Sequence, residues 1–136
     1  MNETVLRAKA ESLRRCLARL RATCPATAEA LAADVDAQDI VSVNLIRAVQ
    51  LAVDMATHEV AALGLPPPGT MAESFQRLET AGRLPPELSQ HLRGAVGFRN
   101  LAVHAYERID WTLVHTLATR RLEDLETLAR HLLARP

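Results

Sequence analysis

The stretch that decides the fold is residues 36–63, which read DAQDIVSVNLIRAVQLAVDMATHEVAAL. Apolar residues recur there every three or four positions, which predicts a long helix with an apolar stripe along one side. The stripe consists of Ile40, Val43, Ile46, Val49, Val53, Ala56 and Val60. Leu45, Ala48 and Ala52 widen the stripe beyond what a surface helix needs, so we expect this helix to be central.

Signals for further helices flank this segment on both sides. Gly64 is a suitable terminator for the central helix, and prolines follow it. Thr70 and Glu73 match a capping box, and Asp110 is a good N-cap for the last helix. We expect these further helices at about residues 3–23, 27–33, 71–82, 86–104 and 111–134.

The residue types agree with a helical protein. Ala, Leu, Arg and Glu dominate, and they are strong helix formers, whereas alternating stretches rich in β-branched and aromatic residues are missing. The sequence therefore predicts an all-α fold, an antiparallel, up-and-down bundle of four long helices plus short helices. A chain of 136 residues has room for one domain, so we expect residues 1–136 to form a single domain.

The charges balance overall but are unevenly distributed. Sixteen Lys and Arg against sixteen Asp and Glu argue against a generally basic protein that coats nucleic acids, although a local basic site remains compatible. Residues 29–59 hold six acids and one base, whereas residues 83–108 hold four arginines, two acids and two histidines. The basic segment could form a modest positive pocket that holds phosphate.

Nothing in the sequence directs the chain to a membrane or out of the cytoplasm. No apolar run approaches the roughly 18 residues of a membrane span. The first 20 residues are charged throughout and lack the apolar centre of a secretory signal. We therefore expect a cytoplasmic protein without membrane contact. Cys16 and Cys24 are expected to be small, buried or half-buried residues.

The segment that carries chemistry is residues 97–106, GFRNLAVHAY. Arg99 can bind phosphate oxygens with a planar fork of donors. His104 can give or take a proton near neutral pH. Asn100 and Tyr106 can orient groups or donate hydrogen bonds. These residue types together suit work on a phosphodiester.

Helical geometry leaves the assembly of this site open. On a helix, Asn100 and His104 share a face, as do Arg99 and Tyr106. Arg99 and His104 diverge by about 140°, because five residues separate them at roughly 100° each. Either the helix loosens near His104, or two copies of the segment meet across a two-fold axis and complete each other.

The ordered set of residues resembles a known family. Arg99, four residues and His104 resemble the Arg-x4-His signature of the HEPN superfamily. With Ala105 and Tyr106 the match is closer to the Arg-x4-His-x-Tyr form of the HepT ribonuclease toxins. The likeness extends upstream over residues 39–45, 54–66 and 73–78. Ala105 departs from the family, which often has a polar residue such as Asp there.

The resemblance implies a HEPN-like homodimer that cuts RNA, either tRNA or mRNA, without a metal ion or a cofactor. It implies that Arg99 and His104 are catalytic and that Asn100 and Tyr106 support them. It also implies a cognate antitoxin, a minimal nucleotidyltransferase like MntA, that silences the toxin by attaching AMP to Tyr106.

Other polar residues were weighed from the sequence. His91, Arg93 and Arg108 are candidate RNA contacts around the motif. Asp54 and His58, four apart on the central helix, form a helix-surface pair or part of a metal site. Further ligands at suitable spacing are missing, so no metal site is expected. An alternative function is a non-catalytic helical binding subunit that partners a nucleotidyltransferase and presents its substrate.

Overall fold

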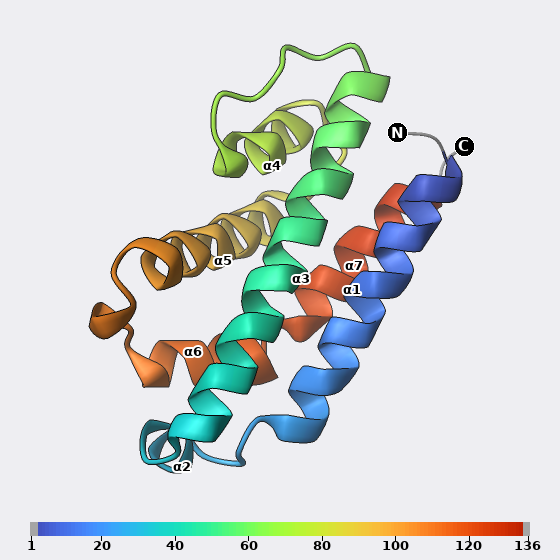
Figure 1. Ribbon diagram of the computed structural model, residues 1–136. Helices are drawn as coiled ribbons and strands as arrows, with labels where there is room; N and C mark the ends of the chain where they lie inside the picture. Colours follow the sequence, from blue (N-terminus) through green and yellow to red (C-terminus); the bar gives the residue numbers. More distant parts are fainter. Residues whose placement is uncertain (1–2, 135–136) are drawn as a thin grey trace.

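The computed structural model describes residues 3–134, and these contain seven α-helices, one 3₁₀ turn and no strand. Figure 1 shows the helices in chain order. They are α1 (Glu3–Thr23), α2 (Ala28–Ala32), α3 (Val35–Ala62), α4 (Met71–Thr80), α5 (Pro86–His104), the 3₁₀ turn η1 (Tyr106–Arg108), α6 (Trp111–Thr119) and α7 (Leu122–Leu133). The all-α prediction is confirmed, and most helix ends lie within two residues of their expected positions.

Helix α3 is the central element, as expected, and it contacts every other α-helix of the described chain. In Figure 1, α1 runs antiparallel to α3 and α7, and these three lie side by side. Helix α5 lies obliquely across α3 instead of alongside it, with α4 and α6 on either side. The up-and-down arrangement thus holds for α1 against α3 and α7, while α5 crosses the bundle.

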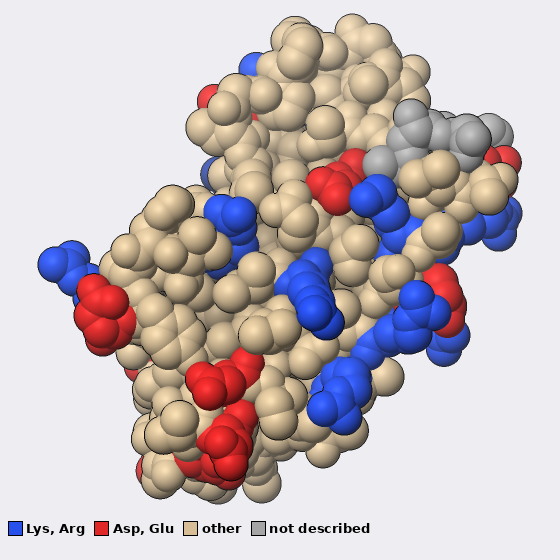
Figure 2. Space-filling view, viewed as in Figure 1, with Lys and Arg blue, Asp and Glu red and all other residues tan. Residues whose placement is uncertain are grey.

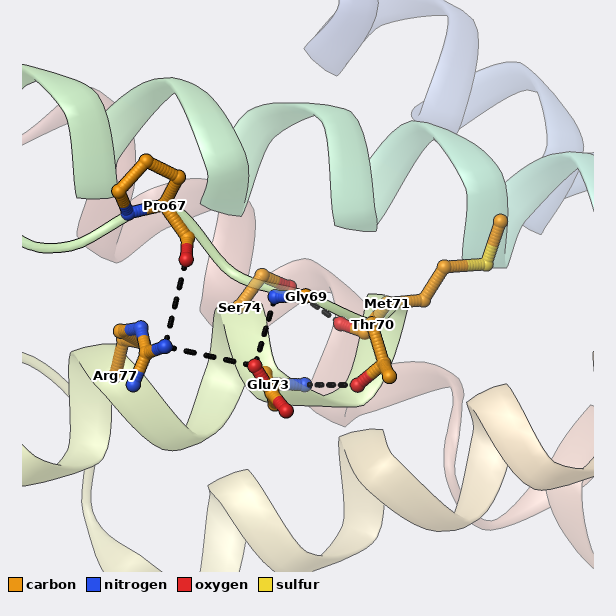
Figure 3. Close-up of polar contacts among 7 residues, drawn as sticks. All are labelled: Pro67, Gly69, Thr70, Met71, Glu73, Ser74 and Arg77. Atoms are coloured by element: carbon orange, nitrogen blue, oxygen red, sulfur yellow. Dashed lines mark hydrogen bonds and ion pairs between the residues drawn. The ribbon is translucent and has the colours of Figure 1, made fainter.

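Side-chain caps explain where several helices begin. Thr27, Asp34 and Asp110 each accept a hydrogen bond from a backbone amide in the first turn of α2, α3 and α6. At the start of α4, Thr70 Oγ1 accepts from the amide of Glu73 at 3.2 Å (Figure 3). The Glu73 carboxylate accepts from the amide of Gly69 at 2.7 Å, one residue earlier than in an ideal capping box.

The last predicted helix, 111–134, is wrong as a single element, because the chain breaks into α6 and α7 at residues 120–121. Thr116 and Thr119 each donate a hydroxyl hydrogen bond to the carbonyl four residues earlier. Such bonds compete with the helical ladder and bend helices. The amide of Arg121 reaches back to the carbonyl of Thr116, five residues away, and the new direction buries Leu122.

The buried face of α3 differs from the predicted stripe in its first half. Ile40 is 36% exposed and Val43 46% exposed, whereas Val41 and Leu45 are buried. A run of three-residue steps rotates about 60° backwards per step, so it drifts off any single face of a helix. The buried face steps by four residues more often than by three. Its apolar residues are Ala37, Val41, Leu45, Ala48, Val49, Ala52, Val53, Met55, Ala56 and Val60, which include the second half of the predicted stripe.

Helix α3 is also the one described helix long and apolar enough to cross a membrane by length and composition, with a mean hydropathy of 1.3 over 18 residues. Arg47 and Asp54 interrupt it, so counting uninterrupted apolar runs did not single it out. The described structure buries 56% of that window, as in the core helix of a bundle.

Two ion pairs tie α3 to its neighbours. Glu59 is 2% exposed, and its Oε2 lies 2.8 Å from Nη2 of Arg83, in the turn before α5. Asp54 accepts hydrogen bonds from Lys9 of α1 at 3.0 Å and from Gln50 at 3.1 Å. The charged residues of α3 therefore place α1 and the start of α5 against the central helix.

Candidate functional site

Helix α5 carries three of the four motif residues. Pro86 occupies its first turn, where a missing amide costs nothing, and the helix continues without interruption to His104. The amide of Ala105 still donates to the carbonyl of Leu101 at 2.7 Å, so the helix does not loosen before His104. In one chain, Arg99 and His104 therefore point about 140° apart around α5.

Arg99 is half-buried on α5, and one of its donors is without a partner. Its Nη1 donates to Oδ1 of Asn100 at 3.2 Å. Its Nε is buried and has no hydrogen-bond partner among the described residues. The side chain of Asn100, expected to support His104 from the next turn, thus bonds Arg99. An unsatisfied guanidinium donor is costly to bury, and an anionic oxygen would satisfy it.

Tyr106 lies beyond the end of α5. Ala105 has φ −151° and ψ 58°, outside the helical region, and Tyr106 begins the 3₁₀ turn η1. The expectation that Arg99 and Tyr106 share a helix face is therefore wrong, because the helix ends at His104. The Tyr106 hydroxyl donates to Oδ1 of Asp39 on α3 at 3.3 Å.

The surroundings leave Tyr106 and His104 accessible. Tyr106 is 39% exposed, and its ring packs edge-on against Trp111 with the ring centroids 5.9 Å apart. Trp111 in turn packs against the core. His104 is exposed at the last residue of α5. Sequence reasoning missed Asp39 as a neighbour of Tyr106, because 67 residues separate them.

The candidate RNA contacts lie in different environments. His91 Nδ1 is 3.2 Å from Oδ2 of Asp124 and 3.4 Å from Nη1 of Arg121, so it belongs to a network between α5 and α7. Arg93 pairs with Glu79 of α4 at 3.5 Å. Arg108 is exposed in η1. Of the three, only Arg108 shares the surface segment that carries Tyr106.

The remaining reactive groups do not form a separate centre. Within residues 3–134, no group of three or more His, Cys, Asp and Glu side chains is placed to hold a metal ion. Both cysteines are free, Cys16 buried and Cys24 half-buried, as expected. Burial raises the pKa of each thiol above its usual value, so both favour the neutral form.

Comparison with known proteins places this geometry in context. Residues 13–132 match the family model described as ribonuclease HepT-like. Over 126 residues the chain is 29% identical to the mRNA nuclease HepT of Shewanella oneidensis, covering 93% of each chain.

Solved structures of toxin–antitoxin complexes share the fold. A tri-AMPylated HEPN toxin of Shewanella oneidensis in complex with MNT antitoxin has a TM-score of 0.90 at 28% identity, covering 99% of this chain and 100% of that chain. A toxin–antitoxin with AMP-PNP has a TM-score of 0.87 at 27% identity, covering 97% and 99%. The HEPN-like helical fold is thereby confirmed.

Proposed function

Because this chain belongs to the HepT-like ribonuclease family of HEPN toxins, we propose that it is an endoribonuclease toxin whose catalytic residues are Arg99 and His104. The observation that carries the proposal is the buried, unpaired Nε donor of Arg99. Its half-buried guanidinium has an unsatisfied Nε beside an exposed face of α5, and a phosphate oxygen is the partner this donor lacks. The name of the Shewanella oneidensis relative favours mRNA as the substrate class.

The residues account for RNA cleavage without a metal ion. The ribose 2′-hydroxyl loses a proton as its oxygen attacks the adjacent phosphorus, and the departing 5′-oxygen gains a proton. His104 transfers these protons. Arg99 stabilises the negative charge that develops on the phosphate oxygens, and Asn100 holds the guanidinium in place. DNA lacks the 2′-hydroxyl and is not a substrate by this route.

We assign the complete site to a homodimer. One chain directs Arg99 and His104 to different sides of α5, so Arg99 of one protomer and His104 of its partner would converge on one phosphate. Apolar side chains on the surface support a protein contact in this region. Val103 on α5 is 48% exposed and Leu113 on α6 is 50% exposed.

Regulation by a nucleotidyltransferase antitoxin fits the position of Tyr106. Among residues 3–134, the hydroxyl of this exposed residue is held by Asp39 alone, at 3.3 Å, so a modifying enzyme can reach it. Attack of the Tyr106 oxygen on the α-phosphorus of ATP would attach AMP and release pyrophosphate. The added phosphate would then occupy the region that we assign to RNA phosphate.

The test is RNA cleavage by the purified, unmodified protein in excess chelator, alongside His104→Ala. We expect the wild type to cut RNA and the variant to be slower by at least about 100-fold, the usual contribution of a proton-transferring residue. Equal cleavage by both proteins, or none by the wild type, would overturn the proposal. A stable complex with the transferase, without cleavage or Tyr106 modification, would favour the non-catalytic binding subunit.

A further inference from the structure

A groove between α1 and α3 gathers three arginines from two helices. It encloses about 500 Å³, and Arg15, Arg19 and Arg47 line it together with Asn44 and Leu51. None of the described residues that line it is acidic. Figure 2 shows blue basic side chains gathered over α1 and the adjoining part of α3, separate from the red acids over the start of α3.

These three arginines differ from three other arginines, all on α1, in forming no ion pair with an acid, although Glu11 interacts with Arg15 at longer range. Arg7, Arg14 and Arg21 each pair with a glutamate, on α1 itself or on α7. In contrast, no ion pair of residues 3–134 involves Arg15, Arg19 or Arg47; the only polar side-chain contact among them is from Arg15 to Ser12 at 3.3 Å. Three cations without an ion-paired acid along one groove favour the binding of a polyanion.

The groove leads to the motif tyrosine. A second hollow of about 570 Å³ shares Arg19, Asn44 and Arg47 with the first and ends at Asp39. Asp39 holds the hydroxyl of Tyr106. From Gln50 to Asp39 the two hollows follow α3 for about 16 Å, at 1.5 Å for each residue.

The floor of the second hollow is apolar. Ile40 and Val43, which the sequence places in the core, are partly exposed there. Arginines beside apolar surface suit a ligand with charged and flat apolar parts, and a single-stranded nucleic acid has both in its phosphates and bases. A small inorganic anion would use the arginines but not the floor.

We propose that this groove, lined by Arg15, Arg19 and Arg47, binds the sugar-phosphate backbone of substrate RNA and guides it toward Tyr106. The proposal rests on the proposed ribonuclease function. It adds a binding surface outside the Arg99–His104 motif, connected to Tyr106 through the second hollow and Asp39. It also explains how a protein with no net charge can hold RNA, since the local charge of the groove replaces a general excess of basic residues.

The test measures binding of a fluorescein-labelled single-stranded RNA to unmodified protein that carries His104→Ala, so that bound RNA is not cut. The groove variant replaces Arg15, Arg19 and Arg47 with Gln. The control variant makes the same change in net charge at Arg7, Arg14 and Arg130, three exposed arginines that pair with acids elsewhere. Thermal unfolding of both variants checks that they are folded.

We expect the groove variant to bind RNA at least about tenfold more weakly, and the slope of log K against log salt to become shallower by about 2, as three lost phosphate contacts require. The control variant should change the affinity by less than about threefold. In cleavage assays with His104 intact, the groove variant should raise KM while kcat stays near the wild-type value, because these arginines bind ground state and transition state alike.

The outcomes separate this proposal from the proposed function. If the wild type cuts RNA but the groove variant binds RNA as well as the control variant does, the groove proposal is overturned and the ribonuclease remains. If the wild type cuts no RNA, the ribonuclease function is overturned, and the binding measurement still shows whether the groove binds RNA. Unchanged RNA affinity with an altered oligomeric mass would assign the groove to a protein contact and also overturn the proposal.

Discussion

The hydroxyl of Tyr106, just after α5, donates a hydrogen bond to Oδ1 of Asp39 near the start of α3 at 3.3 Å. This contact connects the only tyrosine of the chain to the central helix. It also joins the end of the Arg-x4-His-x-Tyr motif to the basic groove between α1 and α3. The residue that we expect to be modified is thus held at the mouth of the surface that we expect to bind RNA.

The Tyr106–Asp39 contact can be measured as a coupling free energy. We expect Tyr106→Phe and Asp39→Ala each to lower the free energy of unfolding by about 0.5–1 kcal/mol, because both side chains are exposed and the bond is partly replaced by water. The double variant should lose less than the sum of the two changes, as expected for residues in contact. Urea denaturation of all four proteins gives these values. Strictly additive losses would show that the contact contributes nothing.

A site shared between protomers predicts complementation. Arg99→Ala and His104→Ala should each be inactive alone. Mixed and allowed to exchange subunits, they should recover about a quarter of wild-type activity, because half the dimers are mixed and each has one intact site of two. Cleavage rates before and after mixing provide the measurement. If no activity returns although mass spectrometry detects mixed dimers, both residues act within one protomer.

Modification by the antitoxin should be confined to Tyr106. After coexpression with the partner nucleotidyltransferase, we expect the intact mass of this chain to rise by one or more whole AMP units, with loss of RNA cleavage. Tyr106→Phe removes the accepting oxygen and keeps the ring that packs against Trp111, so the variant should fold normally and stay unmodified. AMP retained on the variant would show that another residue is modified.

The buried ion pair between Glu59 and Arg83 should contribute strongly to stability. Glu59→Gln leaves Arg83 without its carboxylate partner in a site where Glu59 is 2% exposed, and we expect a loss of about 2–3 kcal/mol in the free energy of unfolding. Glu3→Gln breaks the exposed pair with Arg7 and should cost less than about 0.5 kcal/mol. Similar small losses in both variants, measured by urea denaturation, would contradict this assignment.

The Cys16 thiol reports on the charge of the groove. Burial raises its pKa, while Arg47 and Arg15 oppose this shift by favouring the thiolate. In a Cys24→Ser background, reaction with a thiol reagent should therefore rise at a higher pH than for free cysteine. Arg47→Gln removes part of the opposing charge, so the pH of half-maximal rate should move further upward. An unchanged pH of half-maximal rate would mean that Arg47 does not act on the thiol.

Sequence reasoning succeeded where the signals are local. Thr70 and Asp110 mark helix starts because they act on the backbone within one turn. It was wrong where distant residues decide. The predicted stripe included Ile40 and Val43, yet the tertiary packing buries Val41 and Leu45 instead. The break at residues 120–121 was missed, since the apolar spacing continues across it.

The motif was likewise predicted only in part. Its residue types and order indicate a phosphodiester site, but the sequence left open whether the helix loosens near His104, and the structure shows it continuing to that residue. Neither the bond of Asn100 to Arg99 nor that of Tyr106 to Asp39 could be foreseen, because side-chain partners depend on rotamers and on where the helix ends.

By itself the sequence determined which segments are helical and which residues can move protons or hold phosphate, since propensity, capping and residue type act over a few positions. Only the tertiary structure decided that Arg15 and Arg19 face Arg47 across a groove, and that this groove ends at the partner of Tyr106. The proximity of these side chains depends on how α1, α3 and α5 pack. That packing is set by contacts between residues far apart in the chain.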